Sequence, residues 1–70
     1  MIIKFGARGD AVIIIQKQLI NLGFKGKDGK ALKPDGDFGV STEHAVLQFQ
    51  KSVGILADGK VGDKTRAPLS

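Results

Sequence analysis

The sequence predicts a small all-α fold, a compact domain of three helices. Two segments place apolar residues at helical spacing along one face, and a glycine follows each of them directly. A motif of the form D-G-x-(F/V)-G-x-x-T occurs twice, and each copy leads into an expected helix. With only 70 residues, the chain is expected to form a single domain over residues 1–70.

The first helix is expected at about residues 10–22. Its apolar positions recur three or four residues apart and are Val12, Ile15, Leu19 and Leu22. Asp10 lies at the start, where a carboxylate complements the positive end of the helix dipole. Gly23 ends the helix because glycine readily adopts the left-handed conformation found after helix C-termini.

A second helix is expected at about residues 40–53 and a short third one at 63–67. The apolar positions of the second are Ala45, Val46, Phe49 and Val53. Glu43 lies in its first turn, and Gly54 follows its end. Pro68 is expected to end the third helix, because proline lacks a backbone N–H and crowds the preceding turn.

Residues 25–34 are predicted to form a basic loop. This segment holds four lysines, one aspartate, two glycines and a proline, a composition typical of a solvated connection. One interpretation is a surface insertion that the fold tolerates at little entropic cost. The other is a basic finger that touches an anionic surface. The residues leave both interpretations open.

The repeated motif occupies residues 35–42 and 58–65, and the two copies lie 23 positions apart. Asp-Gly favours a tight turn with one residue at positive φ. Phe38 in the first copy and Val61 in the second are expected to point inward. The second glycine then leads into a helix, and the threonine falls in its first turn near free N–H groups.

Charge and composition restrict the class of protein. Eleven lysines and arginines against seven acidic residues give a net charge of +4, which favours anionic partners such as nucleic acid, lipid headgroups or cell-wall polymers. The absence of cysteine excludes disulfides and thiolate metal sites. The longest apolar run, residues 11–15, is far shorter than the roughly 20 residues of a membrane span.

Neither a metal site, a cofactor nor a catalytic residue is expected. His44 is the only histidine, too few for zinc, and is expected to face solvent. Asp35 and Asp37 do not fit a calcium loop, since Val46 stands where a bidentate glutamate belongs. Ser41 and His44 have no surrounding motif that would supply an oxyanion hole.

From Ile3 to Leu69 the chain resembles the small three-helix peptidoglycan-binding domain of bacterial and phage cell-wall hydrolases. Its opening pattern is matched by Ile3, Gly6, Gly9, Val12, Ile15, Gln16, Leu19, Leu22 and Gly23. Its middle pattern is matched by Asp35, Gly36, Phe38, Gly39, Thr42, Ala45, Val46, Phe49 and Gln50. Its closing pattern is matched by Asp58, Gly59, Val61, Gly62 and Thr65.

Three features depart from that family pattern. The loop at residues 25–34 is longer and more basic than usual. Arg66 stands where the family commonly carries tryptophan. Ile13 and Ile14 stand where the family usually carries polar residues. These two isoleucines are expected to form an exposed apolar patch on which a second domain or chain docks.

The resemblance implies a non-catalytic module that binds peptidoglycan and targets an attached hydrolase, such as a phage endolysin or bacterial wall hydrolase. It is expected to be a monomer without a membrane span, acting at the cell wall or in the periplasm. No signal peptide is recognisable, and phage-type export or release at lysis is one route open to it. The alternative is a small basic nucleic-acid-binding or protein-docking domain, since residues 6–9 match a G-x-x-G loop. Of these two, we favour peptidoglycan over nucleic acid.

Recognition is expected to rely on hydrogen bonds and charge, because no tryptophan or tyrosine is present to stack on sugars. The helix starts at residues 39–42 and 62–65 present free N–H groups to carboxylates or acetamido carbonyls. For the polar residues of the repeats, a folding role and a binding role are both open. The candidate ligand-binding residues are Arg8, Asp35, Asp37, Thr42, Gln50, Asp58, Lys60 and Thr65.

Overall fold

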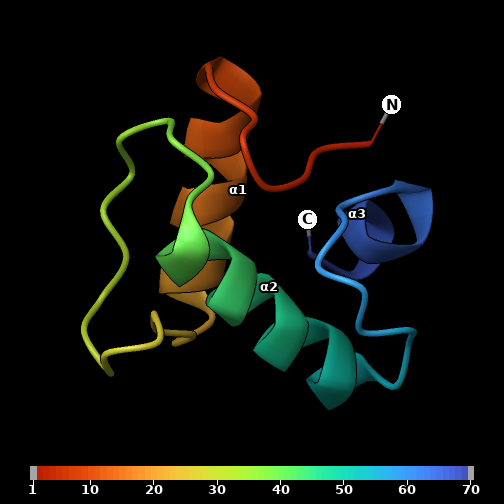
Figure 1. The fold of residues 1–70 in the computed structure, drawn as a ribbon. Coiled ribbons are helices and arrows are strands. Elements are labelled where there is room, and N and C mark those ends of the chain that lie inside the picture. Colours follow the sequence, from red (N-terminus) through yellow and green to blue (C-terminus); the bar gives the residue numbers. More distant parts are fainter. Residues whose placement is uncertain (1, 70) are drawn as a thin grey trace.

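The computed structural model describes residues 2–69, and the helices of this range follow the predicted order (Figure 1). They are α1 (Asp10–Asn21), α2 (Val40–Val53) and α3 (Asp63–Leu69). The described range holds no strand, only three isolated antiparallel bridges. In Figure 1 the long connection between α1 and α2 lies on one side of the molecule and α3 on the other. The predicted all-α, three-helix fold is therefore confirmed.

The third helix is longer than predicted, since it continues through Pro68 to Leu69. Proline at this position removes only one hydrogen bond, to the carbonyl of Lys64, and the helix ends one residue later. Leu69 is buried in the core, so its packing favours the extra residues. None of the helices in residues 2–69 is long and apolar enough to cross a membrane.

One apolar core joins all three helices and both repeats. Its buried members are Ile3, Val12, Ile15, Leu19, Leu32, Phe38, Ala45, Val46, Phe49, Val61 and Leu69. Phe38 and Val61 point inward as predicted. The predictions for Leu22 and Val53 were wrong, because these residues are 51% and 41% exposed. Both lie at the last position of their stripe, where the chain turns away from the core.

The N-terminal segment pairs with both copies of the repeated motif. The backbones of Ile3 and Val61 exchange two hydrogen bonds, of 3.0 and 2.7 Å. The Gly6 N–H donates to the carbonyl of Phe38, whose own N–H donates to Ala7, each at 2.9 Å. The inward-pointing residue of each repeat is thus fixed by the same stretch of chain, which brings the two repeats into one unit.

The basic loop is an ordered part of the fold. Lys25 and Ala31 form an isolated bridge, and the N–H of Gly26 donates to the carbonyl of Lys30 at 3.0 Å. Leu32 is buried in the core, a contact that the sequence analysis missed. A Cβ on Gly26 would come within 2.9 Å of the Ser41 Cβ. The loop therefore packs directly against the start of α2.

Two leucines of the predicted first stripe allow a direct test of this core. Leu19→Ala is expected to lower the free energy of unfolding by about 2–5 kcal/mol, because Leu19 is fully buried. That is a large part of the roughly 4–10 kcal/mol expected for a chain of this size. Leu22→Ala, at an exposed position, should change it by less than about 0.5 kcal/mol. Urea unfolding of both variants checks this, and equal losses would contradict the core assignment.

Candidate functional site

The first repeat folds around the side chain of a buried glutamine on α1. The two hydrogens of the Gln16 amide nitrogen Nε2 are shared among three acceptors: Asp35 Oδ1 (3.1 Å), the carbonyl of Asp37 (3.1 Å) and Thr42 Oγ1 (3.0 Å). Its Oε1 accepts the N–H of Gly36 at 2.9 Å. One side chain thereby connects α1, the Asp-Gly turn and the first turn of α2.

The second repeat has the same arrangement around Gln50 of α2. Its Nε2 donates to Asp58 Oδ1 (3.1 Å), the carbonyl of Lys60 (2.9 Å) and Thr65 Oγ1 (3.1 Å). Its Oε1 accepts the N–H of Gly59 at 3.0 Å. Each partner of Gln50 stands 23 positions after the equivalent partner of Gln16 in the first repeat. We call these two networks the glutamine clamps.

The aspartate of each clamp also closes its own turn. Asp35 Oδ1 accepts the N–H of Asp37 at 3.0 Å, and Asp58 Oδ1 accepts the N–H of Lys60 at 2.9 Å. These backbone hydrogen bonds are the largest cause that lowers the pKa of each carboxyl below its ordinary 3.8. The glutamine amide also lowers each pKa, and desolvation opposes the lowering; desolvation is the weaker of these two effects at Asp35 and the stronger at Asp58.

The predicted Asp-Gly turns are confirmed, with Gly36 at φ +78° and Gly59 at φ +74°. Any Cβ on Gly36 would also lie 3.1 Å from Ile13 Cγ1. Ile13 is therefore half-buried against this turn, which corrects the prediction that it belongs to an exposed patch. Ile14 is 55% exposed, as expected.

The structure separates the candidate residues into two clusters, one at each repeat. Three of them, Thr42, Gln50 and Thr65, are at most 4% exposed and have hydrogen-bond partners inside the clamps. Arg8 joins the first cluster through an ion pair of 3.7 Å between its Nε and Asp37 Oδ1. Both side chains of this pair are largely exposed, so it adds little stability.

Gln16, the equivalent of Gln50, was not among the candidate residues predicted from the sequence. A signal was present, because each glutamine directly follows a core residue, Ile15 or Phe49, on a helix that precedes a repeat. His44 is half-buried on α2, which corrects the expectation that it faces solvent.

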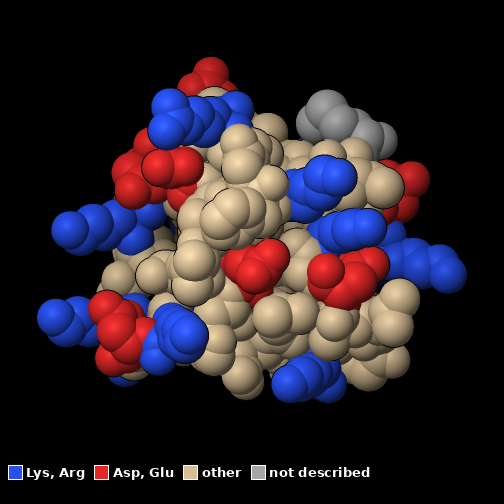
Figure 2. Space-filling model, viewed as in Figure 1, with Lys and Arg blue, Asp and Glu red and all other residues tan. Residues whose placement is uncertain are grey.

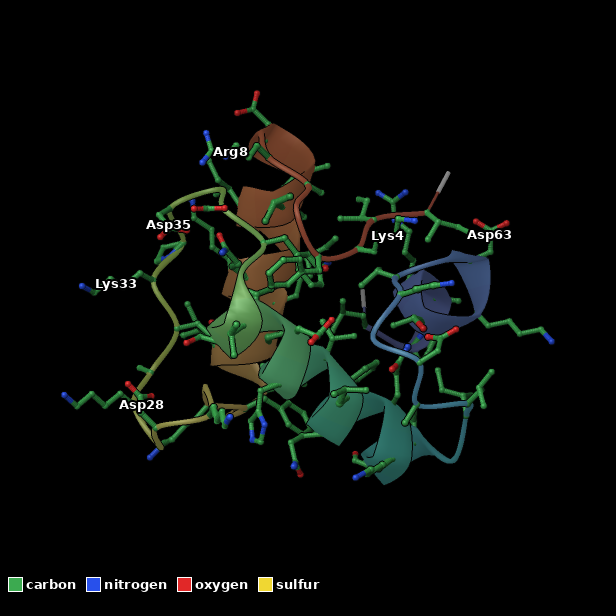
Figure 3. The ribbon with its side chains drawn as sticks, viewed as in Figure 1. Lys4, Arg8, Asp28, Lys33, Asp35 and Asp63 are labelled. Carbon is green, nitrogen blue, oxygen red and sulfur yellow. The ribbon has the colours of Figure 1, made fainter. Side chains whose placement is uncertain are left out.

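A groove of about 460 Å³ opens between the basic loop and the start of α2, and we call it the loop groove. Its charged lining residues are Asp28, Lys30, Lys33, Asp35 and Asp37. Figure 3 shows Asp28, Lys33 and Asp35 along the loop at this side of the molecule. Acidic and basic side chains alternate over the same edge in Figure 2. The groove thus offers both carboxylates and amines to a ligand.

A family model described as "Putative peptidoglycan binding domain" matches residues 8–69. The chain belongs to this peptidoglycan-binding family. The match includes both glutamine clamps and the loop groove, and it confirms the resemblance noted in the sequence.

Known relatives place this peptidoglycan-binding domain within larger cell-wall enzymes. The spore cortex-lytic enzyme of Halalkalibacterium halodurans is 41% identical over 68 residues, which cover 97% of this chain and 19% of that protein. The chain therefore spans about a fifth of this relative.

Solved structures show the same fold. The SleB N-terminal domain is similar with a TM-score of 0.89 and 38% identity, covering 99% of this chain and 88% of that one. The Burkholderia AP3 phage endolysin is similar with a TM-score of 0.88 and 37% identity, covering all of this chain and 25% of that one.

Replacing a clamp glutamine tests its role in this domain. Gln16→Leu is expected to lower the free energy of unfolding by about 2–4 kcal/mol, since the buried Gly36 N–H and Thr42 hydroxyl lose their partner. Gln48→Leu, on the exposed face of α2, is the matched control and should change it by less than about 0.5 kcal/mol. Chemical denaturation measures both, and a silent Gln16→Leu would contradict the clamp.

The lowered pKa values of Asp35 and Asp58 predict acid sensitivity. The folded chain favours the ionised form of these carboxyls more strongly than the unfolded chain does. Their contribution to the free energy of unfolding is therefore complete above the ordinary pKa of 3.8. It is lost as the pH falls through the lower, folded-state values. The double variant Asp35→Asn, Asp58→Asn should therefore lose less stability than the parent between about pH 5 and about pH 2. Denaturation midpoints of both proteins, measured over this pH range, check this. If the two midpoints fell in parallel, these two carboxyls would not be the source of the acid sensitivity.

Proposed function

We propose that this chain is a non-catalytic module that binds peptidoglycan in the loop groove and holds an attached hydrolase on its substrate. The observation that carries this proposal is the groove itself, lined by three carboxylates and two amines beside the start of α2. Family membership supports peptidoglycan as the polymer that is bound.

The chemistry of the groove suits the peptide stems of peptidoglycan better than its sugars. Stem peptides offer carboxylates and backbone amides, which pair with the Lys30 and Lys33 amines and with the Asp35 and Asp37 carboxylates. Sugar rings are commonly bound by stacking on aromatic side chains, and no phenylalanine lines this groove. The chain contains neither tryptophan nor tyrosine.

The two clamp aspartates do not suit the role of a general acid. A general acid must keep its proton near neutral pH, and its pKa is therefore raised. Hydrogen bonds instead lower the pKa of Asp35 and of Asp58. Oδ1 of each carboxylate already accepts from a glutamine amide and a backbone N–H.

Binding by this module helps a hydrolase that is attached to it. A module bound to an insoluble polymer raises the effective concentration of its partner domain near the bonds to be cut. The spore cortex-lytic enzyme and the AP3 endolysin are proteins in which a similar domain forms about a fifth or a quarter of the length. We infer the cell wall as the site of action, with the module working as a monomer and without nucleic acid.

Co-sedimentation with purified sacculi tests the proposal, with chitin particles as control. The chain should pellet with sacculi and not with chitin, and pelleting should persist at about 0.3 M salt, where surface attraction is heavily screened. The variant Lys30→Gln, Lys33→Gln should bind at least about tenfold more weakly, since each charge-assisted hydrogen bond contributes about 1.5–3 kcal/mol.

A matched control separates the groove from net charge. Lys17→Gln, Lys51→Gln removes the same two charges at exposed helix positions outside the loop groove and should bind like the parent. Equal weakening of both variants, or pelleting that salt abolishes, would reduce the proposal to adsorption by charge. No pelleting under any condition would favour the nucleic-acid or protein-docking alternative.

A further inference from the structure

A second groove, of about 280 Å³, lies at the other copy of the repeat, between the N-terminal segment and the start of α3. We call it the α3 groove. Figure 3 shows Asp63, which lines it, on the opposite side of the molecule from Asp28 and Lys33 of the loop groove.

The two grooves are built from equivalent positions of the repeat. The loop groove is lined by repeat residues Asp35, Asp37, Gly39, Val40, Ser41 and Thr42. The α3 groove is lined by Asp58, Lys60, Gly62, Asp63, Lys64 and Thr65. Every member of the second set stands 23 positions after its counterpart in the first. The duplicated motif has therefore produced a duplicated groove, each supported from below by its own glutamine clamp.

The α3 groove presents two large exposed aliphatic side chains beside its amines, whereas the loop groove presents one, Val40. Ile2 and Leu56 line it and are 62% and 79% exposed, so their side chains are largely open to solvent. Lys60 and Lys64 line the same groove, and neither forms an ion pair within residues 2–69. Apolar side chains beside ammonium groups complement a ligand that carries small methyl groups beside a carboxylate.

We propose that the α3 groove is a second peptidoglycan site, which takes the alanine-bearing, carboxylate-ended part of a stem peptide. This inference rests on the proposed function, because it assigns the same polymer to a second position. Peptidoglycan presents stem peptides repeatedly, so a chain with two equivalent grooves engages two of them. Simultaneous occupation makes the second contact intramolecular and strengthens attachment to sacculi beyond that of either groove.

The binding test uses the intact chain and two pairs of variants on sacculi at about 0.3 M salt. Leu56→Ser, Lys64→Gln should weaken binding about tenfold, because only one groove then holds the polymer. Leu22→Ser, Lys51→Gln is the matched control, because it changes an exposed leucine and an exposed lysine that lie outside both grooves, and it should bind like the parent. Thermal unfolding verifies that both variants are folded.

A second measurement identifies the ligand. In the isotope-labelled chain, a disaccharide-tetrapeptide should shift amide resonances of residues 56–65 as well as those of residues 30–42. The disaccharide alone should leave residues 56–65 unshifted. Shifts confined to residues 30–42, together with parental binding by Leu56→Ser, Lys64→Gln, would overturn the second site and leave the proposed function intact. Failure of the parent chain to bind sacculi would overturn both.

Discussion

The fold depends on the carboxamide of a buried glutamine, used once in each half of the domain. A carboxamide is suited to this position because it carries a donor and an acceptor on one rigid plane. In each clamp it satisfies an aspartate, a glycine N–H, a backbone carbonyl and a threonine hydroxyl together. A chain without disulfides can thus keep irregular loops on its core, since no buried side-chain polar atom in residues 2–69 lacks a partner.

The same clamps explain how two grooves coexist with so small a core. Thr42, Gln50 and Thr65 lie beneath the surface and fix the shape of the loops, whereas Lys33, Lys60 and other exposed side chains of those loops remain available to a ligand. The polar residues of the repeat are therefore divided between a buried set that shapes the loops and an exposed set on the surface. This division decides which of the candidate residues a ligand can reach.

Local pattern was enough to predict most of the fold, and long-range contacts account for what it missed. Helical spacing and glycine punctuation predicted α2 to the residue and α1 to within one. Leu22 and Val53 were misassigned because spacing cannot show where the core ends along a helix. Leu32 was missed because it is a single apolar residue in a loop, where no periodic pattern indicates which side chains are buried. Gln16 was missed because its partners lie 19 to 26 residues away, so its role appears only when the chain is folded.

The pairing of Ile3 with Val61 has a consequence for how the domain is made. These two residues are far apart in the sequence, so closing the loop between them has a high entropic cost. Their hydrogen bonds are therefore expected among the last contacts to form. During synthesis on a ribosome, Ile3 emerges well before Val61, so the core cannot close until the second repeat has been made. Until then Ile3 lacks its backbone partner, and the core lacks Val61 and Leu69. The domain consequently folds as one cooperative unit, after its translation is essentially complete.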